Sequence, residues 1–327
     1  MTDTQNEVFK TPVNKIRLFE HGAPGSQNLK LTRKYYTEDM PDGRVKHIVQ
    51  NITDPDIVPY IPDGIGNSTD RQRIPAVLII PGGAFRRLVY NFEGEDVAKW
   101  LNSMGIAAFV LECRLPSDEH DNAEDVPLID AMRAMRVIRG RAQEFGIDEA
   151  KIGVMGFSAG GFMAALLSTA YESDVYADYK YKDEYDKLSA RPDFAVCSYP
   201  VISIDDCIEA GKRYMSEEQV LERISDSKAK ILHKYNPDKL VRPDMPPVFI
   251  CETDDDRTTL SENSVGFYMA ARKAGVSAEL HIFRTGGHGY GCGDDFAQTG
   301  EWKVLFTKWI KSIGCLLYTS DAADDSL

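Results

Sequence analysis

The chain has 327 residues, of which 43% are hydrophobic and 27% are charged, and its formal net charge is −13. That length and apolar content are sufficient for one large buried core, and the acidic excess repels a phosphate backbone, so nucleic acid is not expected as a partner. The first residues contain no apolar run of the signal-peptide type and no stretch is long enough to span a membrane, so we expect a cytoplasmic protein without membrane contact. None of the six cysteines belongs to a C-x-x-C pair, and the sequence indicates neither a metal site nor a cofactor.

Strands and helices alternate along the chain from residue 75 onward. Continuous apolar runs bounded by Gly or Pro predict buried strands at 75–83, 106–115, 151–157, 194–202, 246–253 and 278–285. Apolar residues at three- and four-residue spacing predict helices between these strands, at 95–105, 123–146, 158–170, 261–275 and 301–314. The alternation predicts an α/β fold with a mostly parallel central sheet and helices on both of its faces.

Three segments lie outside this alternation. Residues 1–72 are polar and irregular, and we expect an N-terminal leader with short strands. Residues 203–245 separate two predicted strands and predict a helical insertion. The tail at 315–327 continues no pattern and resembles translated sequencing-adaptor readthrough, so we expect it to be non-native. No low-complexity linker divides the remainder, and residues 1–314 are expected to form a single domain.

Residues 156–160, Gly-Phe-Ser-Ala-Gly, have the form G-x-S-x-G between a predicted strand and a predicted helix. In that context a sharp turn exposes a serine hydroxyl above the sheet. A phosphate-binding loop would require Lys and then Ser or Thr after its last glycine, but Phe162 and Met163 stand there, and the glycine spacing does not match G-x-G-x-x-G. We therefore predict that Ser158 is a nucleophile and that the Ala159 amide faces a developing oxyanion.

A serine nucleophile needs a base, because a free hydroxyl is hardly ionised at neutral pH. His288 lies in a glycine-rich loop directly after the last predicted strand, where the backbone is free to carry an imidazole into a site. His281 lies within a predicted strand and His233 in the insertion. The remaining histidines lie in polar segments typical of solvated side chains: His21, His47 and His120. The sequence therefore predicts His288 as the base.

The base in turn needs an orienting carboxylate. Three candidates, Asp254, Asp255 and Asp256, directly follow the strand predicted at 246–253, and spacing alone does not choose between Asp255 and Asp256. The order Ser, Asp, His along the chain is that of the α/β-hydrolases.

A second group of oxyanion donors is predicted after the first long strand. Residues 81–85 read Pro-Gly-Gly-Ala-Phe, and small residues there let backbone amides approach a reacting carbonyl. We therefore predict that the amides of Gly83 and Ala84 complete an oxyanion hole with that of Ala159.

Together these motifs resemble the acetyl-esterase and xylan-esterase-like branch of the α/β-hydrolases, which is grouped with carbohydrate esterases and feruloyl-esterase-like lipases. The similarity runs from about residue 13 to residue 314 and is strongest in "IPGGAFRRLVYNFEGEDVAKWLNSMGIAAFVLECRLP", "IGVMGFSAGGFMAA" and "SENSVGFYMAARKAGVSAELHIFRTGGHGYG". The resemblance implies Ser158 as nucleophile, His288 as base and Asp256 as acid. Two departures stand out: Ala84 replaces a third glycine, and a leucine and a serine replace the usual Val-Pro near Leu260.

By this resemblance, the chain is expected to be a carboxylic ester hydrolase that removes acetyl groups from sugars or xylo-oligosaccharides, its small-molecule partners, without metal or cofactor. A general short-chain carboxylesterase or lipase is one alternative. A serine peptidase of the prolyl-oligopeptidase-like type is another, because it has the same order of residues, although it usually carries a propeller domain. A non-catalytic binding protein on the same scaffold is disfavoured by the complete Ser, Asp and His set.

Overall fold

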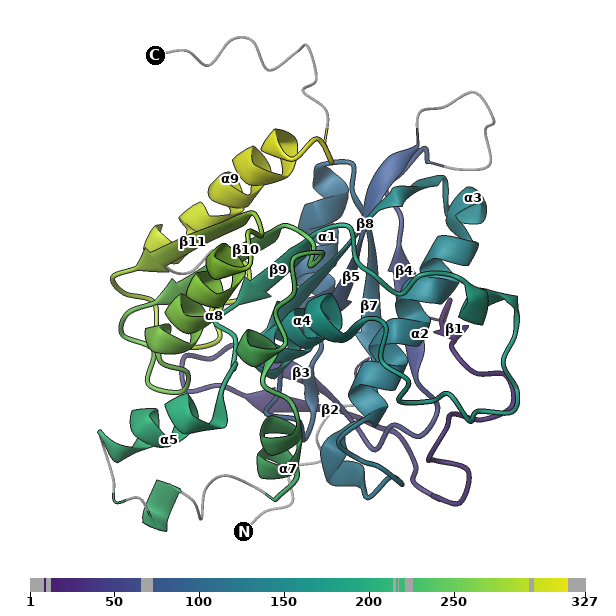
Figure 1. The fold of residues 1–327 in the computed structure, drawn as a ribbon, viewed down its shortest axis with the longest axis horizontal. Helices are drawn as coiled ribbons and strands as arrows, with labels where there is room; N and C mark the ends of the chain where they lie inside the picture. The colour runs from purple at the N-terminus through teal and green to yellow at the C-terminus, as the bar shows by residue number, and fades with distance from the viewer. Residues whose placement is uncertain are drawn as a thin grey trace.

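The structure is a computed structural model that describes Phe9 and residues 13–65, 73–213, 216, 218–220, 226–293 and 297–316. Its centre is an eight-stranded sheet with the strand order β1-β4-β7-β5-β8-β9-β10-β11 (Figure 1). The strands of this sheet are β1 (Ile16–Arg17), β4 (Asp56–Tyr60), β5 (Ile74–Ile80), β7 (Ala107–Glu112), β8 (Ile147–Phe157), β9 (Ala195–Ser198), β10 (Val248–Thr253) and β11 (Ala278–Phe283).

The sheet is parallel from β7 to β11 and antiparallel at the edge formed by β4 and β1. Strands β7, β9 and β10 are buried along their whole length, which explains why they appear in the sequence as continuous apolar runs rather than as alternating patterns. Because parallel strands end at the same edge of a sheet, the residues that follow β5, β8, β10 and β11 gather at the carboxyl edge.

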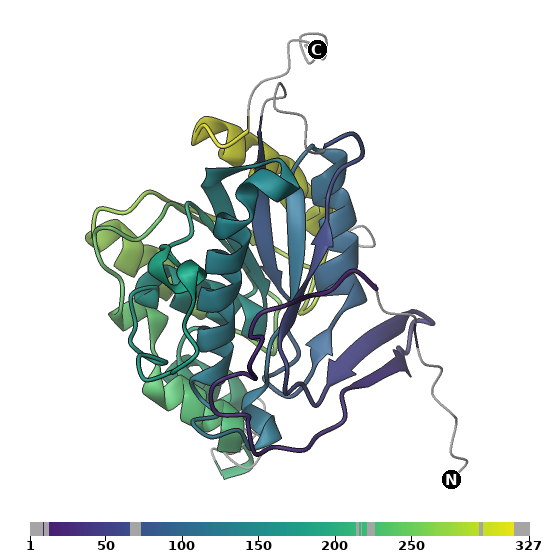
Figure 2. The ribbon, with the colours of Figure 1, turned by 90° about the vertical axis from the view of Figure 1, so that its right-hand side faces the viewer.

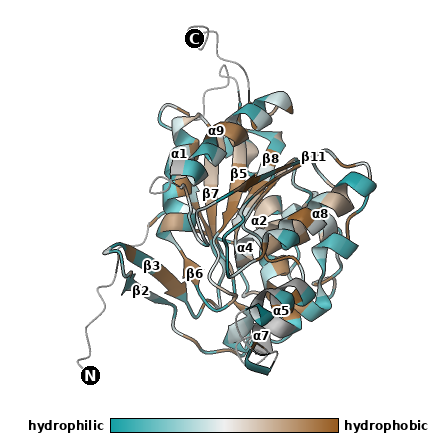
Figure 3. Cartoon of the chain, turned by 90° about the vertical axis from the view of Figure 1, so that its left-hand side faces the viewer, coloured by the Kyte–Doolittle hydropathy of each residue, from teal (hydrophilic) through white to brown (hydrophobic). Residues whose placement is uncertain are grey.

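Helices cover both faces of the sheet, as Figures 1 and 3 show. On one face lie α1 (Asp96–Ser103) and α9 (Ala297–Ser312), and on the other lie α2 (Val126–Gly140), α4 (Ala159–Ala170) and α8 (Ser261–Lys273). The hydrophobic residues are concentrated on the strands between these two layers (Figure 3). Helices α1 and α9 meet through Trp100 and Trp302, whose ring centroids are 4.9 Å apart. The predicted α/β architecture is confirmed.

Two helical segments differ from the prediction. The helix predicted at 123–146 is divided into α2 and α3 (Ala142–Phe145), because Arg141 leaves the helical conformation with φ −104° and ψ 16°. A five-residue π-helix, η1 (Asn91–Glu95), precedes α1, where the sequence predicted only a helix start at residue 95. π-Helical turns are rare and are found mainly at functional sites.

The described part of the leader contains more strand than expected. Strand β3 (Val45–Gln50) pairs with β2 (Lys34–Asp39) on one side and with β6 (Leu88–Val89) on the other, in a separate three-stranded sheet beside the central one (Figure 2). The pairing of β3 with β6 places the leader next to the loop that follows β5.

The segment at 203–245 contains α5 (Ile204–Lys212), α7 (Asp226–Lys234) and the short helix η4 (Pro237–Lys239). Helix α7 packs against η2 (Pro116–Asp118), and the short helix η3 (Glu184–Lys187) packs against α2. Because η2 follows β7 and α5 follows β9, α7 lies at the carboxyl edge of the sheet.

Of the tail predicted at 315–327, Cys315 and Leu316 pack against the core, and the other residues lie outside the described part of the chain. Among the described residues, no helix is both long enough and apolar enough to cross a membrane.

The crossing of β8 and α4 depends on glycine. A Cβ atom added at Gly156 would overlap the carbonyl oxygen of Gly160. We expect Gly156→Ala to lower the free energy of unfolding by about 3 kcal/mol, because strand and helix backbone would have to separate, and urea denaturation measures this change. The matched control is Gly266→Ala in α8, where an added Cβ has no neighbour within 4 Å and the helix should gain about 0.5–1 kcal/mol. Equal urea midpoints for wild type and Gly156→Ala would show that the two elements do not approach this closely.

Candidate active site

Ser158 lies at the sharp turn between β8 and α4. Its backbone has φ 54° and ψ −117°, a conformation that non-glycine residues rarely adopt. The turn is held by the Ser158 amide, which donates to the Ser198 carbonyl oxygen at 3.0 Å, and by Gly160, where a Cβ would overlap the Ile80 carbonyl oxygen. The strained turn at the carboxyl edge is the conformation that G-x-S-x-G predicts.

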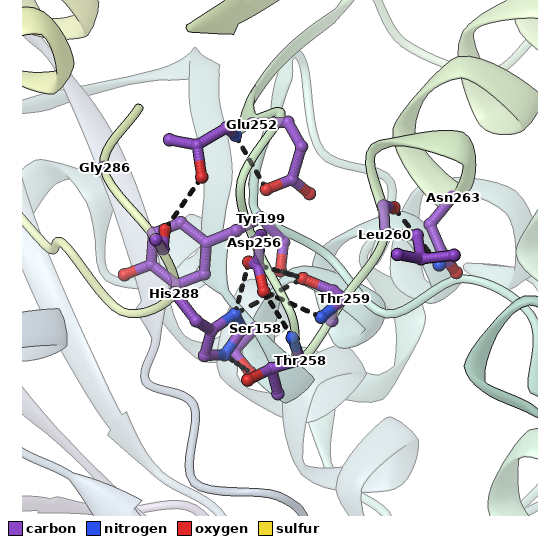
Figure 4. Close-up of polar contacts among 12 residues, drawn as sticks. Ser158, Tyr199, Glu252, Asp256, Thr258, Thr259, Leu260, Asn263, Gly286 and His288 are labelled. Atoms are coloured by element: carbon purple, nitrogen blue, oxygen red, sulfur yellow. Dashed lines mark hydrogen bonds and ion pairs between the residues drawn. The ribbon is translucent and has the colours of Figure 1, made fainter. Parts of the chain in front are cut away.

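His288 lies between Ser158 and Asp256 and contacts both (Figure 4). Its Nε2 is 2.8 Å from Ser158 Oγ, and its Nδ1 is 2.6 Å from Asp256 Oδ2. An ionised carboxylate can only accept hydrogen bonds, so Nδ1 carries the imidazole hydrogen and donates it to Asp256. Nε2 is then the acceptor for the Ser158 hydroxyl hydrogen. The arrangement can therefore move a proton from Ser158 to His288.

Asp255 and Asp256 have different partners, although they are adjacent in the sequence. Asp255 Oδ1 accepts hydrogen bonds from the amides of Gly286 and Gly287, at 2.9 and 2.8 Å. Asp256 points inward and is only 3% exposed. The structure thus brings Asp256 to His288, whereas Asp255 holds the loop that carries the histidine.

Asp256 accepts several further hydrogen bonds (Figure 4). The amides of Thr258 and Thr259 donate to its Oδ1 at 2.7 and 2.9 Å, and the Thr259 hydroxyl donates to its Oδ2 at 2.9 Å. Burial alone would raise the pKa of Asp256, but the hydrogen bond and charge of His288, together with these amides, hold the pKa below its usual value. The carboxylate is therefore ionised at neutral pH, which is the form that orients the imidazole.

The loop after β5 has a strained backbone beside Ser158. Gly83 has φ 142°, and the two non-glycine residues that follow, Ala84 and Phe85, have φ 58° and 61°. Such conformations persist only where the surroundings hold them. Within the part of the chain that the structure describes, no protein acceptor takes the amide hydrogens of Gly83, Ala84 or Ala159. All three amides are therefore available to a ligand.

Two buried side chains beside this loop were not identified from the sequence. Glu93 Oε2 accepts a hydrogen bond from the Gly82 amide at 2.8 Å, and Glu93 Oε1 accepts one from the Tyr199 hydroxyl at 2.9 Å. The Tyr199 ring lies edge-on to His288, with centroids 5.1 Å apart. No short motif indicates this contact, because Glu93 and Tyr199 are 106 residues apart in the chain.

A small cavity lies beside the loop after β5. Its lining includes Gly82, Gly83, Leu88, Ala159 and Met163, and it has room for about one water molecule. Within the described residues, no three or more His, Cys, Asp or Glu side chains are grouped as the ligands of a metal ion would be.

His120 was expected to be solvated, and this is wrong. Its side chain is buried, with Nδ1 3.0 Å from Ser26 Oγ. The Ser26 hydroxyl accepts a hydrogen bond from Arg114, which leaves its own hydrogen free for donation to a neutral His120 Nδ1. Its Nε2 has no hydrogen-bond partner among the described residues. Burial, and then the charge of Arg114, lower the pKa of His120 from 6.5 to about 4.

This shift predicts a pH-dependent stability. Between pH 6.5 and pH 4 the unfolded chain protonates His120 while the folded chain does not, so the folded state loses stability as the pH falls through this range. The full shift corresponds to about 3 kcal/mol, of which about 2–3 kcal/mol is lost by pH 4, because the folded-state His120 is itself half protonated at that pH. We therefore expect His120→Gln to gain about 2 kcal/mol relative to wild type between pH 7 and pH 4, measured by urea denaturation at each pH. Parallel stability curves for the two proteins would contradict the burial of a neutral imidazole.

Comparison with known proteins gives the family of the chain. The sequence profile of the family described as BD-FAE matches residues 65–270. An acetylxylan esterase of Xylanibacter ruminicola is 31% identical over 240 residues, which make up 73% of this chain and 45% of that protein. An endo-1,4-beta-xylanase B of Butyrivibrio fibrisolvens is 31% identical over 227 residues, 69% of this chain and 34% of that protein. This chain spans less than half the length of these curated relatives.

Solved structures have the same fold. The acetyl ester-xyloside bifunctional hydrolase of Caldicellulosiruptor lactoaceticus is 34% identical, has a TM-score of 0.69, and is matched over 93% of this chain and 97% of that chain. The carboxylesterase Cest-2923 of Lactobacillus plantarum, at 21% identity and a TM-score of 0.65 over 88% of this chain and 100% of that chain, has the same fold. The resemblance stated from the sequence motifs is confirmed. The profile match covers more than half of the residues, and the chain belongs to the BD-FAE family of esterase-type α/β-hydrolases.

Proposed function

We propose that this protein hydrolyses the carboxylic esters of acetylated carbohydrates, with Ser158 as nucleophile, His288 as general base and Asp256 as the acid that orients it. The proposal rests above all on the two hydrogen bonds of His288, 2.8 Å to Ser158 Oγ and 2.6 Å to Asp256 Oδ2. Nucleophile, base and orienting carboxylate at these distances are the requirements of acyl transfer through a serine.

In the proposed reaction Ser158 Oγ attacks the ester carbonyl carbon while its proton passes to His288 Nε2. The charge of Asp256 stabilises the imidazolium that forms. Collapse of the tetrahedral intermediate breaks the bond to the alcohol, and His288 returns the proton to the leaving oxygen. Water then attacks the carbonyl carbon of the acyl-serine, with His288 taking a water proton. Collapse of this second tetrahedral intermediate breaks the bond between the acyl carbon and Ser158 Oγ, His288 returns the proton to Oγ, and the carboxylic acid is released.

The negative charge on the tetrahedral intermediate needs donors that are already in place. We propose the amides of Gly83, Ala84 and Ala159 for this role, since none of them has an acceptor among the described residues of the protein. Each preorganised donor of this kind contributes about 3 kcal/mol to lowering the barrier. Ala84 carries a methyl group where the family usually has glycine, and this residue is exposed.

An acetyl group on a sugar is the substrate that the observations favour. One relative is named an acetylxylan esterase, and one similar structure is named an acetyl ester-xyloside bifunctional hydrolase. Together these support a short acyl chain and a xylose-containing alcohol.

Two assays test the proposal. With p-nitrophenyl esters of increasing acyl length, kcat/KM is expected to be highest for acetate and to fall by about tenfold or more at butyrate, as the proposed preference for acetyl esters requires. Acetylated xylo-oligosaccharides are expected to release acetate. Activity that rises with chain length would favour a general carboxylesterase or lipase, and hydrolysis of prolyl p-nitroanilides in preference to esters would favour a peptidase. Absence of hydrolysis with every ester would refute the proposed function.

A further inference from the structure

We infer that Glu93 is a positioning residue for this reaction. Through Tyr199 it holds the loop of the proposed oxyanion donors and the loop of His288 in place relative to each other. This inference rests on the proposed function, because it assigns a role to Glu93 only if the neighbouring groups act on an ester.

The contacts of Glu93 connect both sides of the site. Glu93 Oε2 accepts a hydrogen bond from the amide of Gly82, which precedes the proposed donor Gly83, at an N–O distance of 2.8 Å. Glu93 Oε1 accepts a hydrogen bond from the Tyr199 hydroxyl at 2.9 Å. The same hydroxyl accepts a hydrogen bond at 3.1 Å from the amide of Gly291, which lies three residues after His288. A single chain of three hydrogen bonds therefore runs from one catalytic loop to the other.

The π-helix that carries Glu93 lies against both loops. A Cβ at Gly82 would lie 2.8 Å from Glu93 Oε2 and 2.9 Å from Ser158 Cβ, so the carboxylate lies close to the nucleophile. A Cβ at Gly291 would lie 2.7 Å from the Phe92 carbonyl oxygen, so the same π-helix touches the histidine loop. The two glycines allow these close approaches.

Strained backbone lies close to the Gly82 end of the hydrogen-bond chain and at Tyr199 within it. Ala84 and Phe85 have φ 58° and 61°, and Tyr199 has φ 37°. Each such conformation carries an energetic penalty and relaxes unless neighbouring groups hold it. Glu93 bonds to the residue two positions before Ala84 and to the side chain of Tyr199. Loss of these bonds therefore leaves strained segments free to relax away from the reactive geometry.

Packing does not explain a carboxylate at this place. Glu93 is only 5% exposed, and an apolar side chain would fill the same space without the penalty of burying a charge. Burial raises the pKa of Glu93, while the charge of His288 and the hydrogen bonds from Tyr199 and Gly82 act in the opposite direction. Burial likewise raises the pKa of Tyr199 well above 10, so its hydroxyl remains a donor. The role we infer for the carboxylate therefore lies in the two hydrogen bonds that its oxygens accept.

The test measures kcat and KM of the full chain for p-nitrophenyl acetate. In Glu93→Gln the amide oxygen can accept only one of the two hydrogen bonds, and in Tyr199→Phe the link to Gly291 is lost. We expect each variant to lower kcat by about 10- to 100-fold and to change KM by less than about threefold. The reason is that the groups on these two loops stabilise the transition state more than they stabilise the bound substrate. The double variant should lose no more than the larger single loss, since both residues act in one chain.

Glu95→Gln is the matched control, since Glu95 belongs to the same π-helix but pairs with Lys99 at 2.7 Å on the surface. Its kcat is expected to stay within about twofold of wild type. Unchanged kcat in Glu93→Gln and Tyr199→Phe, losses that multiply in the double variant, or a rise in KM alone would each overturn the inference. If Glu93→Gln does not fold, Tyr199→Phe decides, because it keeps Glu93 and removes one hydroxyl. Wild-type inactivity on all esters would instead refute the proposed function itself.

Discussion

Ser158→Ala is expected to lower kcat for p-nitrophenyl acetate by about 10⁵-fold or more, to the level left by binding and the oxyanion donors alone. The loss is this large because the covalent path needs the hydroxyl that His288 Nε2 accepts at 2.8 Å. Initial rates with enough enzyme to detect the residual reaction measure it, and KM should change little, because the hydroxyl contributes to the transition state and not to substrate binding.

Ser168→Ala is the control for this variant. Ser168 lies on the same helix α4, is buried, and donates to the Ala164 carbonyl oxygen at 2.7 Å. The substitution removes one serine hydroxyl, as Ser158→Ala does, but leaves the hydrogen bonds among Ser158, His288 and Asp256 unchanged. Activity should therefore stay within about twofold of wild type. Comparable activity in Ser158→Ala and Ser168→Ala would reject Ser158 as the nucleophile.

Asp256→Asn is expected to lower kcat by about 10⁴-fold at neutral pH. An asparagine amide can donate to His288 Nδ1, and this moves the imidazole hydrogen to Nε2, where it blocks proton transfer from Ser158. The carboxylate charge that stabilises the imidazolium is lost as well. The fall should be smaller at high pH, where hydroxide partly replaces the missing base, so a full pH profile of kcat is the informative measurement.

The neighbouring substitution Asp255→Asn gives the sharpest comparison, because it makes the same chemical change one residue away. The asparagine side-chain oxygen can still accept the amides of Gly286 and Gly287, which Asp255 Oδ1 accepts at 2.9 and 2.8 Å. We expect a loss of less than about tenfold. If Asp255→Asn lost as much activity as Asp256→Asn, the assignment of the orienting acid would be wrong.

The fold and the position of Ser158 could be predicted because their signals are local. Buried parallel strands appear as apolar runs, and the glycines around Ser158 are needed wherever β8 and α4 approach closely. The local sequence does not show whether Asp255 or Asp256 is the residue that contacts His288. This choice depends on the loop conformation after β10, which turns one carboxylate toward His288 and the other toward Gly286.

Other parts of the site depend on contacts between distant segments. Glu93 and Tyr199 are 106 residues apart, and neither lies in a recognisable motif. His120 lies in a polar stretch, but its ring is buried beside Ser26 of the leader, which in turn accepts a hydrogen bond from Arg114, two residues after β7. The break at Arg141 between α2 and α3 directly follows Gly140, a residue of low helix propensity at which an added Cβ would overlap the Tyr185 ring.

The central claim is that Ser158 is the group that attacks the substrate, and covalent labelling tests it most directly. Diethyl p-nitrophenyl phosphate reacts with an activated serine, releases p-nitrophenol and leaves a diethyl phosphoryl group on the oxygen. We predict one p-nitrophenol per chain, a label located on Ser158 by peptide mass spectrometry, and loss of esterase activity in proportion to labelling. Full esterase activity after stoichiometric labelling of Ser158, or inactivation with the label on another residue, would contradict it.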